Sequence, residues 1–313
     1  MKLRTLYLVG CMALATIVAL QGCDPDWKFD TNYEPELVVE GSITTNGFSR
    51  VYLSESKSLN HTLDSLTLSE LPVVSAKVTV SDGSRTEILV GRIDRNRMPY
   101  FAYTGSEIRG VPGRTYTLTI TYHDRVMTAQ TTIPKVVPLD SLRLRPSAES
   151  DTLYQATGYF RDPEGETNYY KIFTQVEEKD KDLFNAFMGS FSDEILSHPE
   201  AEAEIYRAFR HTTVKGDKYT PFFKPGEVVR FCFAQVPLAG FRFWSLYENE
   251  VMNNSNPIIP STTNLPGNVD GALGLWMGYG ASYYRVEVKD TCYSFLPDTN
   301  NPSSIFTTSS FIK

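Results

Sequence analysis

Three carboxylates lie at alternate positions within one short segment of the chain. Asp162, Glu164 and Glu166 are separated by Pro163 and Gly165. Carboxylate oxygens gathered in one turn can bind a calcium ion if a backbone carbonyl and another carboxylate converge on them. Proline and glycine at these positions are also sufficient to form a hairpin turn with its charges in water. We favour the hairpin turn, and the calcium site formed by Asp162, Glu164 and Glu166 is the alternative.

The sequence lacks the usual motifs of several enzyme classes. His61, His123, His198 and His211 are far apart, and none belongs to a His-x-x-x-His or His-Glu-x-x-His pair that would bind zinc. The sequence contains no Gly-x-Ser-x-Gly elbow and no Gly-x-x-x-x-Gly-Lys phosphate loop. We therefore expect no enzymatic activity, no resident metal and no cofactor. An atypical hydrolase whose triad is assembled only by the fold stays open as a less favoured alternative.

Aromatic residues raise a second kind of binding chemistry, because exposed rings can stack on the faces of sugars. Several occur as adjacent pairs, among them Tyr169-Tyr170, Phe222-Phe223 and Tyr283-Tyr284. Neighbouring residues in a strand point to opposite faces, so at least one ring of each pair is expected in a core. Trp276 and Tyr279, within a glycine-rich aromatic segment, are the candidate ligand-binding residues.

Cys23 follows an apolar segment whose length fits export better than membrane spanning. Residues 6–20 are uncharged and apolar, and basic residues precede them, as in a secretory signal peptide. The sequence Leu20-Gln21-Gly22-Cys23 resembles the bacterial lipobox, whose cysteine receives a diacylglycerol before the signal is cleaved. We expect a signal peptide over 1–22, lipidation of Cys23 and a tether over 23–35. An ordinary signal peptide or an uncleaved anchor is the alternative.

Two cysteines remain once Cys11 leaves with the signal and Cys23 is acylated. Cys232 and Cys292 both lie in aromatic, strand-like segments. In an exported protein they could form a disulfide, or each could be a buried thiol. Sequence spacing does not supply the Cα separation that a disulfide requires, so both alternatives stay open.

Composition limits the class of protein further. The formal net charge is −7, which does not suit binding to nucleic acid. Hydrophobic residues make up 41% and aromatic residues 12% of the chain. This content is enough for one or two packed cores, and the length favours two domains.

Short β-rich segments separated by turn residues dominate the first part of the chain. In residues 76–80 and 115–120, apolar side chains alternate with threonine and lysine, as a half-buried antiparallel strand requires. Asp82-Gly83 is a strong hairpin signal, because glycine tolerates the positive φ of a tight turn. The pattern predicts an immunoglobulin-like β-sandwich over 36–134.

The second part of the chain is expected to be a β-rich domain with one or two helices. The proline-dense residues 135–142 favour a stiff connector, followed by this domain over 143–296 and a polar tail over 297–313. One helix is predicted from about Asp193 to Phe209, on account of its alanines and glutamates. A second is predicted from the near-helical spacing of apolar residues between Leu238 and Val251.

The order of several short motifs resembles one known family. The motifs are Leu37-Val38-Val39-Glu40-Gly41, Val78-Thr79-Val80-Ser81-Asp82-Gly83, Gly113-Arg114-Thr115-Tyr116-Thr117-Leu118, Ile133-Pro134, Val137-Pro138-Leu139-Asp140-Ser141, Phe160 to Tyr170, Phe191-Ser192-Asp193-Glu194, and Asn256-Pro257 before a Gly-rich aromatic segment. Together they resemble the Bacteroidota lipoproteins grouped as domain of unknown function 4249. The similarity extends from about Leu37 to Val288. In this chain, Trp276-Met277 departs from the more regular glycine-phenylalanine pattern of the family.

The resemblance implies a cellular location and a receptor that is encoded nearby. Members are typically lipid-anchored and often encoded near TonB-dependent outer-membrane receptors, and the family supplies no catalytic residues. Asp24 and Asp26 resemble the surface-export signals of lipoproteins in this phylum, which favours the cell surface and leaves the periplasmic side open. We expect an outer-membrane accessory protein that docks with a TonB-dependent receptor and assists ligand capture, gating or assembly. A free-standing surface lipoprotein that binds a glycan or peptide ligand is the alternative.

Overall fold

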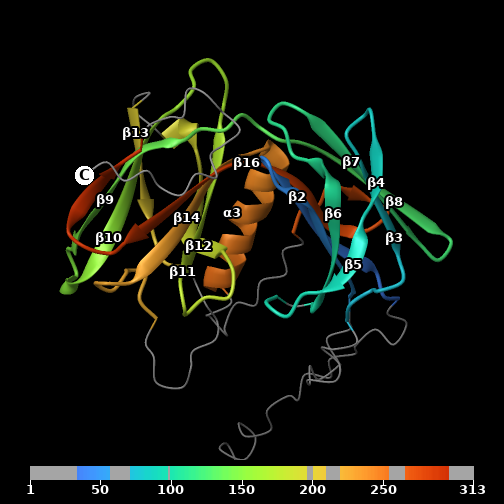
Figure 1. Ribbon diagram of the computed structural model, residues 1–313, viewed down its shortest axis with the longest axis horizontal. Helices are drawn as coiled ribbons and strands as arrows, with labels where there is room; N and C mark the ends of the chain where they lie inside the picture. The colour runs from blue at the N-terminus through green and yellow to red at the C-terminus, as the bar shows by residue number, and fades with distance from the viewer. Residues whose placement is uncertain are drawn as a thin grey trace, which may run out of the picture. The chain divides into compact units, whose positions relative to one another are not determined.

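The computed structural model describes residues 34–56, 71–97, 99–195, 200–208, 219–253 and 265–295 (Figure 1). Cys23, the expected signal peptide and the expected polar tail lie outside these residues. The described residues from Pro35 onward belong to one compact unit. Strands dominate, which confirms the expected mostly β class. Within the described residues, no helix combines the length and the apolar character needed to cross a membrane.

The largest sheet has eight strands in the order β12-β11-β14-β16-β1-β2-β6-β5. The strands are β1 (Leu37–Thr44), β2 (Phe48–Glu55), β5 (Val90–Ile93), β6 (Phe101–Arg109), β11 (Tyr169–Val176), β12 (Phe184–Ser192), β14 (Val228–Val236) and β16 (Leu273–Glu287). β1 pairs with β16 in parallel, and the other neighbours pair antiparallel. β16 therefore joins the N-terminal and C-terminal parts of the chain in one sheet.

Two smaller sheets complete the β structure. One has the order β15-β8-β7-β3-β4 and the other β13-β10-β9-β17. The strands of the first are β3 (Lys77–Ser81), β4 (Thr86–Ile88), β7 (Thr115–Tyr122), β8 (Arg125–Thr132) and β15 (Val269–Asp270). The strands of the second are β9 (Leu139–Ser147), β10 (Ser150–Arg161), β13 (Glu200–Ile205) and β17 (Thr291–Ser294).

Each smaller sheet shares a hydrophobic core with part of the large sheet. One core combines side chains of β3, β7 and β8 with side chains of β1, β2 and β6, and it includes Trp276 of β16. The other combines β9, β10 and β13 with β11, β14 and β16. A third cluster lies on β14 and β16, where Phe241 and Phe243 of the helix α3 (Leu238–Asn253) pack against it. The large sheet is therefore covered on both faces over β14 and β16.

The alternation expected in the N-terminal strands is confirmed. Val78 and Val80 of β3 lie opposite Ile120 and Leu118 of β7, and all four side chains are fully buried. The threonines between them face away from the core, as the two-residue period of a strand requires.

The predicted helix between Leu238 and Val251 is confirmed as α3. It begins directly after Pro237, whose carbonyl accepts hydrogen bonds from the amides of Gly240 and Phe241 at 2.9 and 3.1 Å. A Cβ on Gly240 would lie 2.3 Å from Cε of Met277. The glycine therefore lets the first turn of the helix approach β16 closely.

The predicted helix from Asp193 to Phe209 is wrong. A single 3₁₀ turn, η1, covers Asp193–Ile195, and β13 (Glu200–Ile205) follows after residues that are not described. Glutamate and alanine alternate in β13, and every second side chain is buried. Burial of one face at a two-residue period outweighs the modest helix propensity of these residue types.

The expected connector overlaps a strand. Residues 133–138 lie outside the strands, but β9 begins at Leu139, so the last part of the expected 135–142 connector is strand instead. The parallel pairing of β1 with β16 carries the large sheet across the expected boundary. The division into two domains and the immunoglobulin-like topology stay predictions.

Candidate functional site

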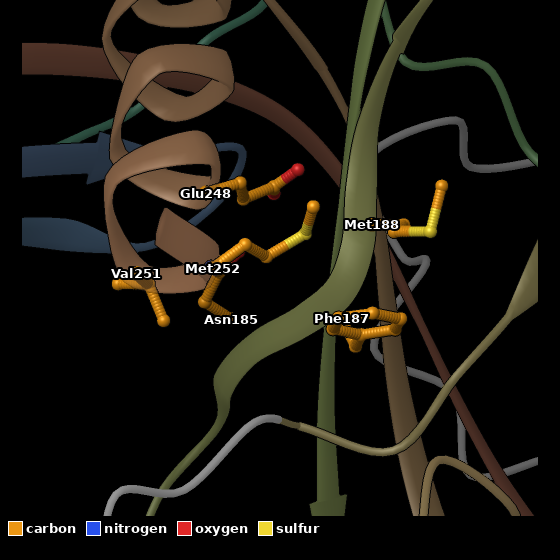
Figure 2. A pocket seen from close by; sticks show the side chains of 6 residues that line it. All are labelled: Asn185, Phe187, Met188, Glu248, Val251 and Met252. Carbon is orange, nitrogen blue, oxygen red and sulfur yellow. The ribbon is translucent and has the colours of Figure 1, made fainter. Parts of the chain in front are cut away.

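A surface hollow lies between β12 and the C-terminal half of α3 (Figure 2). The hollow is shallow and open to solvent, and the centre of a water molecule can occupy only about 10 Å³ of it. The lining residues are Asn185, Phe187, Met188, Glu248, Val251 and Met252. Its walls thus combine apolar and sulfur-containing side chains with two polar ones.

A bulge in β12 forms one wall of the hollow. Lys171 of β11 pairs with Ser190, but Phe173 pairs with Asn185, so residues 186–189 of β12 face only one residue of β11. Met188 adopts a φ of 50°, a left-handed conformation that is uncommon for residues other than glycine. The bulge turns Met188 outward, where its side chain is 57% exposed. Bulges commonly redirect side chains beside binding sites.

Two methionines form the exposed rim of the hollow. Met252 of α3 is 43% exposed, and in Figure 2 the ribbon of β12 lies between Met252 and Met188. Phe187 is held in the wall by edge-to-face contact with Tyr206, with ring centroids 6.0 Å apart. Unbranched thioether side chains adapt their shape to different contact surfaces. The rim is therefore suited to an apolar group of a partner.

An ion pair lies beneath this rim. The Lys171 ammonium is fully buried and bonds Oε1 of Glu248, which also accepts a hydrogen bond from the Ser190 hydroxyl at 2.8 Å. Nζ of Lys171 lies 5.0 Å from the ring centroid of Trp244 and 5.5 Å from that of Phe173. Burial lowers the pKa of Lys171 to about 8, although Glu248 partly opposes the shift. The pair fastens α3 to β11 and β12.

The lining also contains an acceptor for which the described residues supply no hydrogen-bond partner. Oδ1 of Asn185 is buried and has no hydrogen bond within the described residues. Lys171, by contrast, is enclosed and already bonded to Glu248. Because Lys171 is enclosed by protein and already paired with Glu248, the ion pair acts as a structural link at the base of the hollow.

The two candidate ligand-binding aromatics are core residues. Trp276 is completely buried, and its indole N–H donates to the carbonyl of Tyr116 at 3.0 Å. Tyr279 is 8% exposed, and its hydroxyl accepts a hydrogen bond from Nε1 of Trp244 at 3.1 Å. Neither ring presents a face to solvent on which a sugar could stack. The ligand-binding interpretation of Trp276 and Tyr279 is therefore wrong.

The two cysteines do not form a disulfide. Cys232 is a buried free thiol on β14, and Cys292 is an exposed free thiol on β17. The two strands belong to different sheets. Burial raises the pKa of Cys232 to about 12, so this thiol stays protonated at neutral pH.

The acidic turn is closed by hydrogen bonds of the protein itself. The side-chain amide of Asn168 donates to the carbonyls of Pro163 and Glu166 at 3.0 and 3.1 Å. Asp162 accepts a hydrogen bond from the Tyr170 hydroxyl, and Glu166 pairs with Lys135 at 3.3 Å.

Among the described residues, no group of three histidine, cysteine or acidic side chains could hold a metal ion. Asp162, Glu164 and Glu166 lie in a turn between β10 and β11, and these strands do not pair with each other but belong to different sheets. The expected hairpin is therefore wrong, and the described residues around the turn give no support to the alternative calcium site.

The sequence interpretation missed the hollow, although one signal was present. Lys171 lies in the otherwise apolar and aromatic segment Tyr169–Val176. A lysine in a strand of this composition is buried and needs a carboxylate partner. Glu248 could not be selected as that partner from sequence, because the two residues come together only when α3 packs on β11.

Fold and site define a mostly β protein with a shallow surface hollow between one sheet edge and a helix. A family model described as domain of unknown function (DUF4249) matches residues 25–285. The chain therefore belongs to this family, which confirms the resemblance carried by the order of its motifs. Comparison with curated proteins finds no match.

Proposed function

We propose that the protein is a lipid-anchored accessory protein of the outer membrane that docks with a TonB-dependent receptor and assists ligand capture, gating or assembly. Cys23 follows an apolar segment and lies in a lipobox-like sequence. This supports anchoring of the protein to the membrane through a lipid. Membership of the family adds support, because the resemblance implies a receptor as neighbour. The role proposed is binding and not catalysis.

The observation that carries the docking proposal is the pair of exposed methionines above an ion pair that is already satisfied. Met188 and Met252 leave apolar surface in water, and burial of such surface contributes roughly 25 cal/mol per Å². Lys171 and Glu248 fix the spacing of the two walls without needing a ligand. A partner can therefore gain apolar burial on a preformed site, at little cost in ordering the protein.

An anchor would strengthen such a contact. A lipid on Cys23 would confine the protein and a receptor to one membrane, which raises the effective concentration of each for the other. A small apolar contact, weak between freely diffusing partners, would then be sufficient for a persistent complex.

The test is affinity purification from mildly solubilised native membranes. We compare the wild type with Cys23→Ala, Met252→Glu and the control Val126→Glu, which places the same charge at a 63% exposed position on β8. A TonB-dependent receptor should accompany the wild type and the control, be lost with Cys23→Ala and be reduced with Met252→Glu. Recovery of the wild-type protein alone would contradict the proposal.

A further inference from the structure

A second surface concerns residues 86–93, which run along the edges of two sheets. β4 is an end strand of the five-stranded sheet, and β5 is an end strand of the eight-stranded sheet. Between them, Leu89 is buried in the core and its amide donates to the carbonyl of Val78 at 2.8 Å. Among the described residues, β4 therefore pairs only with β3, and β5 only with β6.

The free backbone groups of β5 can be assigned from its pairing. The Asp94 amide donates toward β6, to the carbonyl of Tyr100 at 3.0 Å. Backbone groups alternate in direction along a strand, so Arg92 and Val90 also face β6. Gly91 and Ile93 therefore direct their N–H and C=O groups outward, where an added strand would pair with them.

The side chains along this edge are unusually apolar for exposed positions. Ile88 is 62% exposed, Val90 is 50% exposed and Ile93 is 71% exposed. Edge strands of soluble proteins are commonly blocked by charged residues or proline. In β5 the only charged residue is Arg92.

The charge beside this edge indicates which partner it fits. Arg92 and Arg95 are exposed, and neither has a salt bridge to a described carboxylate. Of the acidic residues nearest in sequence, Glu87 is buried and accepts backbone hydrogen bonds, and Asp94 accepts the Tyr52 hydroxyl and lies 3.9 Å from Arg50. The edge is therefore locally basic in a chain whose net charge is −7. A second copy of this edge would place arginines near arginines.

We propose that β5 is a docking edge for an extended segment of another protein, in which apolar and acidic residues alternate. The segment adds as a strand beside β5, pairs with the outward groups of Gly91 and Ile93, covers Ile93 with an apolar residue and places a carboxylate near Arg92. This surface lies apart from the hollow between β12 and α3, and the proposal does not depend on a receptor.

The test uses the full-length protein in detergent with two fluorescent peptides of equal length. One peptide alternates valine with glutamate, and the other alternates valine with lysine. Anisotropy should show that the acidic peptide binds at least about tenfold more tightly, the size of effect that one or two close charge pairs produce. Amide exchange at Gly91 and Ile93 should slow when the acidic peptide is bound.

Two variants make the result specific. Ile93→Pro removes an outward N–H and leaves the bonds to β6 in place, so it should weaken binding of the acidic peptide at least about tenfold. Arg92→Glu changes only an exposed side chain and should reverse the preference between the peptides. The unfolding temperature of Arg92→Glu should match that of the wild type. This variant therefore tests the proposal even if Ile93→Pro fails to fold.

Three outcomes would overturn the proposal. The first is equal binding, or no binding, of the two peptides. The second is a dimer that forms with rising protein concentration and is lost in Ile93→Pro, because a second copy would then occupy the edge. The third is full protection of Gly91 and Ile93 amides without peptide, because another part of this chain would then cover them.

Discussion

Replacing the two members of the buried ion pair, separately and together, tests how α3 is held on the sheet. Glu248→Leu leaves the Lys171 ammonium without its carboxylate at a position that is completely buried. Removing one partner of a buried pair costs about 3–5 kcal/mol. Lys171→Met leaves Glu248, which is 11% exposed and keeps the hydrogen bond from Ser190. Its cost should therefore be smaller, about 2 kcal/mol.

The double variant should be far less destabilised than the sum of the single ones. Methionine and leucine fill similar volumes, and replacing a buried pair by apolar residues is often neutral. We expect Lys171→Met with Glu248→Leu to lose at most about 1 kcal/mol, which gives a coupling energy of about 4–6 kcal/mol in magnitude. Urea unfolding of the four proteins measures these free energies, with equal m-values as the check that each unfolds in the same way.

The free energy of unfolding of these four proteins should also depend on pH. The pKa of Lys171 is about 8 in the folded chain, against 10.5 for an unperturbed lysine, so the unfolded chain holds this proton more tightly. Between these pH values the free energy of unfolding should therefore rise with pH, by about 3 kcal/mol in all. Below pH 8 this contribution is constant.

A comparison of the wild type with the double variant isolates the contribution of Lys171 to the pH dependence. Tyrosines with raised pKa, such as Tyr52 at about 12, act in the opposite direction as pH rises through about 10, but they do so in every variant. The difference between wild type and double variant therefore reports Lys171. Additive single effects, or a difference that does not change between pH 8 and 10.5, would refute the reasoning.

Three further predictions concern other parts of the fold. Glu87→Gln should cost about 1–3 kcal/mol in urea unfolding, because a buried carboxylate oxygen accepts amides of residues 106–108 at 3.3, 2.7 and 3.1 Å; an unchanged midpoint would contradict this. Trp276→Ala should cost about 3–5 kcal/mol, and native stability would show that the ring is not a core residue. Under native conditions a maleimide should modify Cys292 and spare Cys232, whose pKa of about 12 reflects burial; equal labelling in mass spectra would refute the assigned burial.

Local patterns in the sequence were sufficient for elements whose period and turn residues agree. Tyr116, Leu118 and Ile120 alternate with threonine and are all buried. Asp82-Gly83 forms the expected turn, with Gly83 at a φ of 88° and the Asp82 carboxylate accepting the amides of residues 84 and 85. Here the signals that specify the structure lie within a few residues of each other.

Other features depend on contacts between distant segments. The parallel pairing of β1 with β16 joins residues more than two hundred positions apart, and no local pattern specifies it. Trp276 illustrates the consequence, because β16 is covered on both faces and a glycine-rich aromatic segment is then a central strand. The error at residues 200–205 was different in kind, since the alternation of glutamate with alanine was visible but was outweighed by their helix propensity.

The most direct test of the proposed docking is crosslinking in intact cells. A photoreactive amino acid replaces Met252 at the rim of the hollow or, as control, Val126, which is exposed on β8. We predict an adduct with a TonB-dependent receptor from position 252 and none from position 126. Absence of a receptor adduct from position 252, or equal adducts from both positions, would contradict docking through the hollow.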